Sequence, residues 1–361
     1  MRLVRHAVSL PLLAAIVLLC AVNARASSAP AVTPDGFQRW FASSCAGKLR
    51  VPDEVEARAG RFRYVFVGGF LNERMPGYFS QNARELRARG VPRKSIHFVA
   101  PSSHKGFEEN LEAIGDDFRR ISAEGPERLV VIAHSRGACD TLAFALQDAQ
   151  FVADRVEALF LVQGPFGGTG VADYVMGEGV PLDRRMPVGS RVVVHLLGRL
   201  ERWVMDRGSH GGMAKLTRSA SRGFWQVTLE RHAAAIPIVG PKTFFVTAKV
   251  HPSRLRLVAR AFARYLLTYY GPNDGLVVLE DQSLPGLGTD LGPLDAGHPD
   301  LTRTSFSTRA KRRVRKALVQ SILMAVGQAE SGAGSEAEPV RPRGPWRGRA
   351  RRNEVAGTSR S

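Results

Sequence analysis

The sequence predicts an α/β fold with a mostly parallel sheet flanked by helices. Short apolar runs rich in β-branched residues alternate with segments in which apolar residues recur every three or four positions. This alternation is typical of strand–helix–strand units, whose crossover helices make neighbouring strands parallel. The 361 residues also suffice for one large domain with a substantial core.

Strands are predicted where β-branched and aromatic residues cluster before a Gly or a polar turn, at 61–70, 94–100, 127–133, 156–164, 242–248 and 275–280. Helices are predicted where the apolar residues recur at helical spacing, at 76–90, 106–122, from Ser135 to beyond Leu146, and at 308–327. These elements define a predicted domain over residues 61–327, preceded by a lead-in segment at 27–60.

The first 26 residues have the composition of a secretory signal peptide. Arg2 and Arg5 precede an apolar stretch from Ala7 to Val22, and small residues stand before a cleavage point near Ala26. The apolar stretch is short for a spanning helix. We therefore expect a secreted or periplasmic product, in which Cys45 and Cys139 either pair or remain separate, with Cys139 packed as a small apolar side chain.

The net charge of +18 is concentrated at the C-terminus. Residues 303–361 hold 14 Lys/Arg and 4 Glu, a balance of +10. Residues 328–361 combine Pro, Gly and Arg with few aliphatic residues, which predicts a basic disordered tail. Such a tail either aids solubility or contacts an anionic membrane surface. No nucleic-acid partner is expected.

The strand–helix alternation breaks down at 170–238. Two apolar helical segments, 192–205 and 223–236, do not fit the rhythm of the sheet. Because the insertion follows the carboxyl end of a strand, where a pocket is expected, we predict a lid or cap. The alternative is a helical pair packed at the sheet edge.

The segment around Ser135 suggests a nucleophile. A buried strand ends in His134-Ser135-Arg136-Gly137 and a helix begins at once, as in a nucleophile elbow. A serine nucleophile needs a His base that a carboxylate orients. Asp274 lies in an Asn-Asp-Gly turn directly before the predicted strand at 275–280, and His298 lies in a Gly/Pro loop before the last predicted helix, so the three residues follow in the order Ser, Asp, His. Each alone has an ordinary structural explanation, but together they predict a catalytic triad.

Two backbone amides are expected to bind the oxyanion of the reaction. One belongs to Arg136, the residue after the serine, at a helix N-terminus. The other is expected from the glycine-rich loop after the first strand, with Phe70 as first choice and Leu71 as second. Gly68 and Gly69 would let that backbone approach closely.

Four segments between Arg61 and Leu301 resemble the α/β-hydrolase superfamily, and within it the secreted bacterial triacylglycerol lipases. They are the strand and oxyanion loop "YVFVGGF", the elbow "VVIAHSRGA", the segment "QGPFGGTGVADYV", and "NDGLV" followed 24 residues later by His298. The resemblance implies an α/β-hydrolase fold with a helical lid, and a lipase or esterase activity.

The chain departs from the family pattern at three places. Gly68 stands where a His is usual, and Ala133 replaces the first glycine of the elbow. Asp300 occupies the place of one calcium ligand of the family, but no carboxylate lies between His232 and Asn273 to complete that site. We therefore predict neither a metal nor another cofactor.

The predicted activity is hydrolysis of carboxylic esters, with acyl lipids as the expected substrates, through an acyl-enzyme on Ser135. Phe166, Trp203 and Met205 are predicted to line the acyl pocket. Two alternatives remain open. One is a hydrolase of another ester class, such as a polyester or a thioester. The other is a catalytically silent module that binds anionic envelope lipids.

Overall fold

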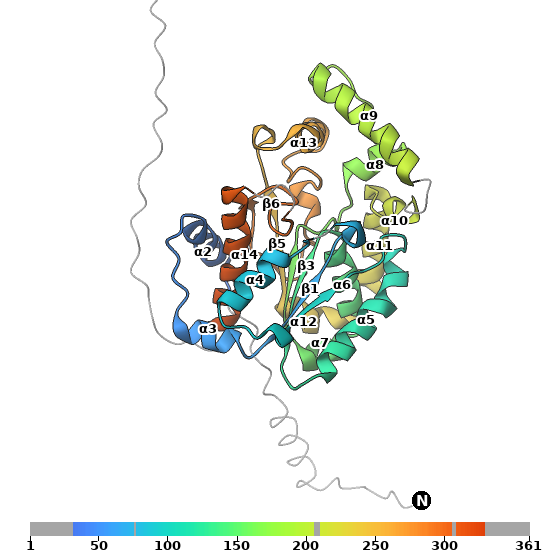
Figure 1. The fold of residues 1–361 in the computed structure, drawn as a ribbon. Coiled ribbons are helices and arrows are strands. Elements are labelled where there is room, and N and C mark those ends of the chain that lie inside the picture. Colours follow the sequence, from blue (N-terminus) through green and yellow to red (C-terminus); the bar gives the residue numbers. More distant parts are fainter. Residues whose placement is uncertain (1–31, 76, 206–209, 305–307, 329–361) are drawn as a thin grey trace, which may run out of the picture. The chain divides into compact units, whose positions relative to one another are not determined.

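Six parallel strands form the central sheet of the computed structural model (Figure 1). Their order is β2-β1-β3-β4-β5-β7, with bounds β1 Arg63–Val67, β2 Ile96–Val99, β3 Leu129–His134, β4 Val156–Val162, β5 Thr243–Val246 and β7 Thr289–Asp290. All the adjacent pairs are parallel. β1, β3 and β4 are buried along their whole length, as expected for strands covered on both faces.

The structure describes residues 32–75, 77–205, 210–304 and 308–328, all within one compact unit. The predicted signal peptide lies outside the described residues, as does the predicted tail beyond Gln328. No helix in the described ranges is both long enough and apolar enough to cross a membrane.

One face of the sheet is covered by helices from both ends of the chain. α14 (Arg309–Gly327) packs against α2 (Pro34–Cys45), α3 (Asp53–Ala59) and α4 (Ser80–Ala88) (Figure 1). Tyr64 and Phe66 of β1 point into this layer, where they meet Leu318 and Ile322 of α14 in one apolar cluster. The segment predicted as a lead-in therefore contains two core helices.

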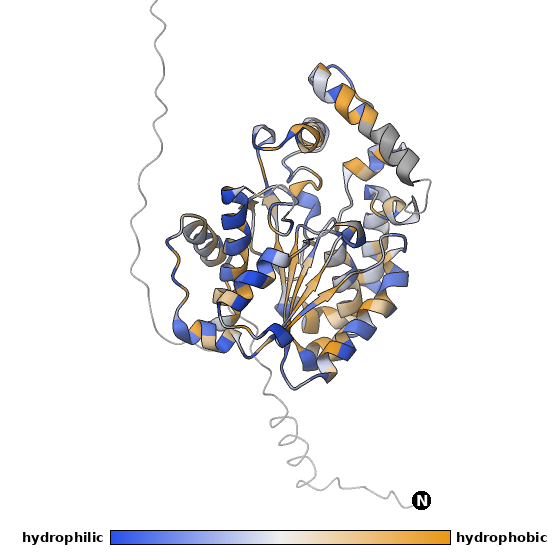
Figure 2. Ribbon diagram, viewed as in Figure 1, coloured by the Kyte–Doolittle hydropathy of each residue, from blue (hydrophilic) through white to orange (hydrophobic). Residues whose placement is uncertain are grey.

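The other face carries α5 (Phe107–Ala123), α6 (Arg136–Gln147), α7 (Ala149–Arg155), α11 (Arg218–Arg231) and α12 (Ile236–Val239). Val65 and Val67 alternate with the residues of the first face and belong to this second cluster, as does Trp225 of α11. Figure 2 shows the strands as a largely hydrophobic layer between helices with hydrophilic outer surfaces.

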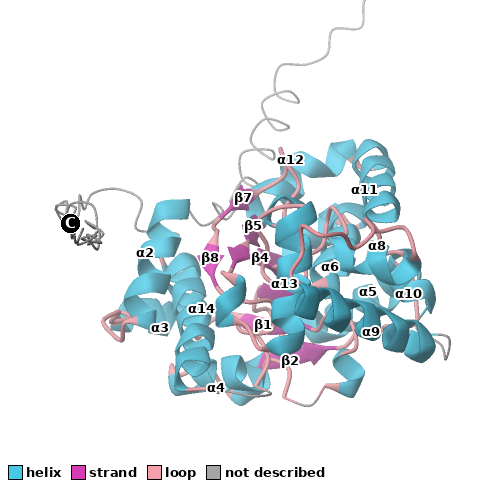
Figure 3. Cartoon of the chain, turned by 90° about the horizontal axis from the view of Figure 1, so that it is seen from above, coloured by secondary structure: helices cyan, strands magenta, loops and turns pink. Residues whose placement is uncertain are grey.

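The insertion between β4 and β5 has two parts. α11 and α12 join the core, because Trp225 and Val239 are buried there. α8 (Gly170–Met176) and α9 (Val188–Met205) lie instead beyond the carboxyl ends of the strands, beside α13 (Leu257–Tyr269) (Figures 1 and 3). Of the predicted lid at 170–238, α8, α9 and the short α10 (His210–Ala214) therefore remain candidates for a lid, whereas α11 and α12 belong to the core.

The strand predicted at 275–280 is wrong. These residues form a turn followed by the 3-10 helix η6 (Leu279–Asp281), and β7 occupies the edge of the sheet instead. The Asp274 side chain accepts hydrogen bonds from the Leu276 and Val277 amides, which are then unavailable to a sheet ladder. Val277 and Val278 are nevertheless buried, so their apolar character marked burial and not a strand.

Of the two alternatives left open for the cysteines, the structure has the unpaired one, because Cys45 and Cys139 are both free thiols. Cys139 is fully buried in α6, and this burial raises the pKa of its thiol. It packs as a small apolar side chain.

We expect Leu318→Ala to lower the free energy of unfolding by about 2–5 kcal/mol, because it leaves a cavity where α14 meets the sheet. Urea unfolding would measure the change. Leu257→Ala is the control, since that side chain is 71% exposed and its truncation should change stability little. Equal effects of the two substitutions would contradict the assignment of α14 to the core.

Candidate active site

Ser135 occupies a strained turn between β3 and α6. Its backbone has φ 56° and ψ −133°, a combination that costs a non-glycine residue roughly 1–3 kcal/mol. The Ser135 amide donates to the Val162 carbonyl at 2.9 Å, which secures the turn to β4. A Cβ at Gly137 would lie 2.2 Å from the Gly68 carbonyl oxygen, so this position requires glycine. The turn has the geometry expected of a nucleophile elbow.

The structure brings Ser135, His298 and Asp274 into one hydrogen-bonded chain. The His298 Nε2 lies 2.9 Å from the Ser135 Oγ, and the His298 Nδ1 lies 2.8 Å from the Asp274 Oδ2. Asp274 is fully buried and His298 is only 6% exposed. This geometry allows the imidazole to take the serine proton while the carboxylate orients the ring.

Both oxygens of the Asp274 carboxylate are held by further donors. Oδ1 accepts from the Leu276 and Val277 amides at 2.9 and 2.8 Å. Oδ2 accepts from the Gln163 Nε2 at 2.8 Å in addition to its contact with His298. These contacts fix the rotation of the carboxylate, so that Oδ2 faces the imidazole.

The backbone on either side of His298 is tied to its neighbours. The His298 amide donates to the Asp274 carbonyl at 2.8 Å, and the His298 carbonyl accepts from the His134 Nε2 at 2.9 Å. The His134 Nδ1 then accepts from the Tyr78 hydroxyl at 2.5 Å. Burial, with the nearby His298 as a second cause, lowers the pKa of His134 well below its ordinary value. A neutral His134 fits this pattern of one donor and one acceptor.

Asp300 also supports the loop that carries His298. Its Oδ2 accepts from the Gly297 amide at 3.2 Å, and its Oδ1 lies 2.6 Å from the Lys311 ammonium. Asp300 corresponds to one calcium ligand of the lipases that the sequence resembles, and here the Lys311 ammonium lies beside its carboxylate. Within the described residues, no group of three His, Cys, Asp or Glu side chains could hold a metal ion.

The two segments that carry the predicted oxyanion donors, the start of α6 and the loop after β1, both lie next to Ser135. Arg136 is the first residue of α6, where a helix amide has no intrahelical partner. Gly69 lies directly against the elbow, since a Cβ there would be 2.8 Å from the Ser135 Cβ. The Leu71 amide donates to the Ser103 Oγ at 2.6 Å. Of the two predicted loop donors, Phe70 therefore remains.

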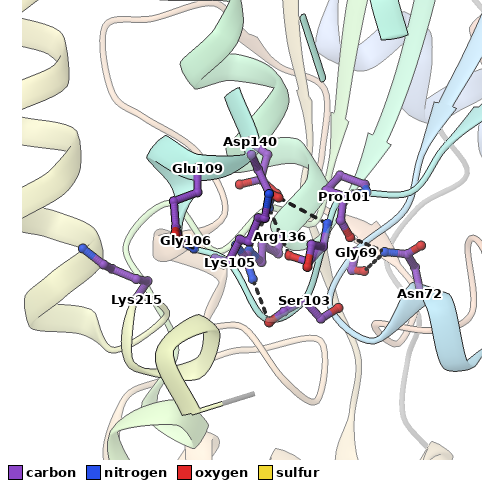
Figure 4. Close-up of polar contacts among 12 residues, drawn as sticks. Gly69, Asn72, Pro101, Ser103, Lys105, Gly106, Glu109, Arg136, Asp140 and Lys215 are labelled. Carbon is purple, nitrogen blue, oxygen red and sulfur yellow. Dashed lines mark hydrogen bonds and ion pairs between the residues drawn. The ribbon is translucent and has the colours of Figure 1, made fainter. Parts of the chain in front are cut away.

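The Arg136 side chain anchors the loop after β2 (Figure 4). It is 2% exposed and donates to the backbone carbonyls of Ser103 and Lys105. Its Nε lies 3.6 Å from the Asp140 Oδ2, and this oxygen accepts a hydrogen bond from the Asn110 Nδ2 at 3.1 Å. Gly212 of α10 packs on this group, because a Cβ there would be 2.1 Å from the Ser103 carbonyl oxygen. The insertion thus contacts the elbow region directly.

Of the predicted acyl-pocket residues, the structure describes the side chain of Phe166. Phe166 is fully buried between Trp225 and Phe245, so a substrate would reach it only if these neighbours moved. The side chains of Trp203 and Met205 lie outside the described residues. A cavity of about 1090 Å³ lies between α5, α6 and α11, and no predicted site residue lines it.

Two other carboxylates that follow Asp274 in the sequence, Asp281 and Asp290, lie elsewhere. Asp281 pairs with Arg218 and Arg222 of α11, and Asp290 accepts from the Thr247 hydroxyl. Neither is hydrogen-bonded to His298. Asp274 is therefore the carboxylate that the fold delivers to the imidazole.

Four residues of the site were not found by sequence reasoning: Gln163, Tyr78, Asn72 and Asp140. Gln163 directly follows β4 and has φ 50°, and Asp140 lies one helical turn after Arg136. Position at a strand end and helical spacing were the available signals. Asn72 begins the short 3-10 helix η1 (Asn72–Arg74), and Tyr78 lies just before α4, at the start of the helix predicted at 76–90; the sequence around them gives no signal for the contacts that they make.

The buried Asp140 should give stability a distinct pH dependence. Burial raises the pKa of its carboxyl from 3.8 to about 7. Between these two values the folded protein binds more protons than the unfolded chain, so stability falls as pH rises through this window. We expect Asp140→Asn to remove this fall.

Urea unfolding of both proteins at several pH values would measure it. The stability of the variant relative to wild type should increase from pH 4 to pH 7, the window set by the two Asp140 pKa values, and then level off. A difference that is constant across the window would contradict the raised pKa.

No protein-family model and no curated protein sequence matches the chain. Among solved structures, it is similar to a metagenomic carboxyl esterase with 18% identity and a TM-score of 0.50, over 76% of this chain and 77% of the other. It is also similar to a mature lipase of Bacillus licheniformis (16% identity, 65% and 84% coverage, TM-score 0.47) and to a phospholipase of Legionella pneumophila (13%, 62% and 45%, 0.41). The parallel sheet, its strand order and the likeness to the esterase show that the chain has the α/β-hydrolase fold.

Proposed function

We propose that the protein is a serine hydrolase that cleaves carboxylic esters. Ser135 attacks the ester carbonyl while His298 takes its proton, and Asp274 holds the imidazole in the required tautomer. The amides of Phe70 and Arg136 stabilise the tetrahedral oxyanion. His298 then returns the proton to the leaving alcohol, and water hydrolyses the acyl-enzyme with His298 again acting as base.

The observation that carries this proposal is the unbroken chain from the Ser135 Oγ through His298 to Asp274, with contacts of 2.9 and 2.8 Å. A structural role alone would not require a strained backbone at the serine, whose φ is 56°. An Asp carboxylate with no exposed surface and four donors is likewise more than a surface turn needs.

Acyl esters of lipids are the proposed substrates, with α8, α9 and α10 as the lid over the site. Their position beyond the carboxyl ends of the strands supports this role, as does the contact of Gly212 with the Ser103–Arg136 group. We further propose that the chain is exported after cleavage near Ala26 and that its basic tail contacts anionic membrane surfaces. A chain-length series of esters, with a polyester and a thioester for comparison, would separate the substrate classes.

A fluorophosphonate probe should label the wild-type protein at Ser135, because it reacts only with an activated serine. We expect Ser135→Ala to abolish labelling and to lower kcat on a soluble ester by roughly 10³-fold or more. His298→Ala should have the same effect on labelling. Peptide mass spectrometry would locate the modified residue, with detergent added in a parallel sample to open a closed lid.

The control is Ser253→Ala, which removes an exposed hydroxyl bonded to His251 and should leave labelling unchanged. Folded wild-type protein that stays unlabelled with and without detergent would contradict the proposed function. Salt-sensitive binding to anionic vesicles by such an inactive protein would favour the silent lipid-binding module instead.

A further inference from the structure

The proposed oxyanion donor at Phe70 shares a peptide group with the Gly69 carbonyl. A trans peptide is planar, with its N–H and C=O pointing in opposite directions. A contact that holds the Gly69 oxygen therefore also fixes the direction of the Phe70 N–H. No hydrogen bond within the described part of the chain occupies that N–H.

Asn72 holds the Gly69 oxygen twice (Figure 4). Its backbone amide donates to this oxygen at 3.1 Å and its side-chain Nδ2 at 2.9 Å. The same Nδ2 donates its second hydrogen to the Pro101 carbonyl at 2.9 Å. Because both partners are carbonyl oxygens, only the amide nitrogen of the side chain fits between them.

Gly68 makes room for this arrangement. A Cβ at that position would lie 2.8 Å from the Asn72 Cβ and 2.9 Å from its Cγ. Any larger residue would therefore displace the Asn72 side chain from the two carbonyls. Gly68, which stands where the lipases that the sequence resembles usually have a His, therefore leaves the space that the Asn72 side chain occupies.

A second set of contacts fixes the next peptide. The Leu71 amide donates to the Ser103 Oγ at 2.6 Å, and Leu71 itself has φ 60°, a left-handed conformation that is unfavourable for leucine. The Glu73 carboxylate accepts hydrogen bonds from the Ser103 amide and the Ser103 hydroxyl, both at 2.7 Å. The Arg136 side chain, from α6, donates a hydrogen bond to the Ser103 carbonyl and so also holds this residue. The groups before and after the Phe70 amide, the Gly69 carbonyl and the Leu71 amide, are therefore both held by hydrogen bonds.

We propose that Asn72 is the positioning residue of the oxyanion site: its carboxamide clamps the Gly69 carbonyl and so aims the Phe70 N–H at the tetrahedral intermediate. This role rests on the proposed function. In Asn72→Asp a carboxylate replaces the donor and repels the Gly69 and Pro101 oxygens, which favours rotation of the peptide away from the serine. In Asn72→Ala the backbone amide of residue 72 still holds Gly69, so the loss is smaller.

The test compares Asn72→Asp, Asn72→Ala and Asn72→Ser with wild type, on a soluble ester. The measurements are kcat, KM, and the inhibition constants of a trifluoromethyl ketone and of the matching methyl ketone. The first inhibitor forms a tetrahedral adduct with an oxyanion, whereas the second reports ground-state binding. Gln38→Glu is the matched control, because the Gln38 Nε2 also donates to a glycine carbonyl, that of Gly292, remote from the serine.

We expect Asn72→Asp to lower kcat by roughly 10²-fold and to raise the inhibition constant of the trifluoromethyl ketone by a similar factor. KM and methyl ketone binding should change less than about threefold, and Asn72→Ser, which keeps a donor, should recover part of the loss. Thermal unfolding of Asn72→Ser should stay close to wild type, because a side-chain donor remains. Gln38→Glu should change neither inhibitor constant.

A kcat that is unchanged in Asn72→Asp, or a rise in KM alone, would overturn the inference while leaving the proposed function intact. An equal rise in the inhibition constants of both ketones would also overturn the inference, because it would show a loss of ground-state binding. Wild-type protein without turnover or trifluoromethyl ketone binding would instead overturn the proposed function, and this inference with it.

Discussion

The strained turn at Ser135 is the constraint on which the rest of the site depends. A serine at φ 56° persists only because its surroundings hold it. Its amide is bonded to β4, its carbonyl accepts from the Ala138 amide, and Gly137 lets the Gly68 backbone lie against the first turn of α6. The same turn points the hydroxyl toward His298 and leaves the Arg136 amide without a helical partner. The proposed nucleophile and one proposed oxyanion donor thus follow from one local conformation.

The remaining parts of the site converge because loops that follow the strands meet at the same edge of a parallel sheet. Gln163 arrives after β4 and bonds Asp274, and the Asp274 carbonyl holds the His298 amide. His134 and Lys311 reach the same loop from β3 and α14, through the His298 carbonyl and Asp300. The His298 loop is therefore fixed by partners far apart in sequence, and α14 contributes to the site as well as to the core.

The sequence predicted the elements whose signals are local. Gly137 two residues after Ser135, the Asn-Asp-Gly turn at Asp274 and the apolar faces of α5 and α14 can each be recognised within a few residues, and the chain order of Ser135, Asp274 and His298 can be read directly from the sequence. It failed where burial came without regular structure, as at 275–280, where Asp274 takes the amides that a strand would need. Asn72 and Tyr78 could not be identified, because Pro101, the second partner of the Asn72 side chain, and His134, the partner of Tyr78, lie on other segments that only the fold brings close.

The central claim, that Ser135 carries the acyl group during turnover, is tested most directly by trapping that intermediate. Wild-type protein mixed with excess p-nitrophenyl acetate and quenched rapidly in acid should gain one acetyl group on the peptide that contains Ser135. The protein should release nitrophenol in a burst matched to this gain. Acetylation of a different residue, or steady turnover by Ser135→Ala at the wild-type rate, would contradict the account.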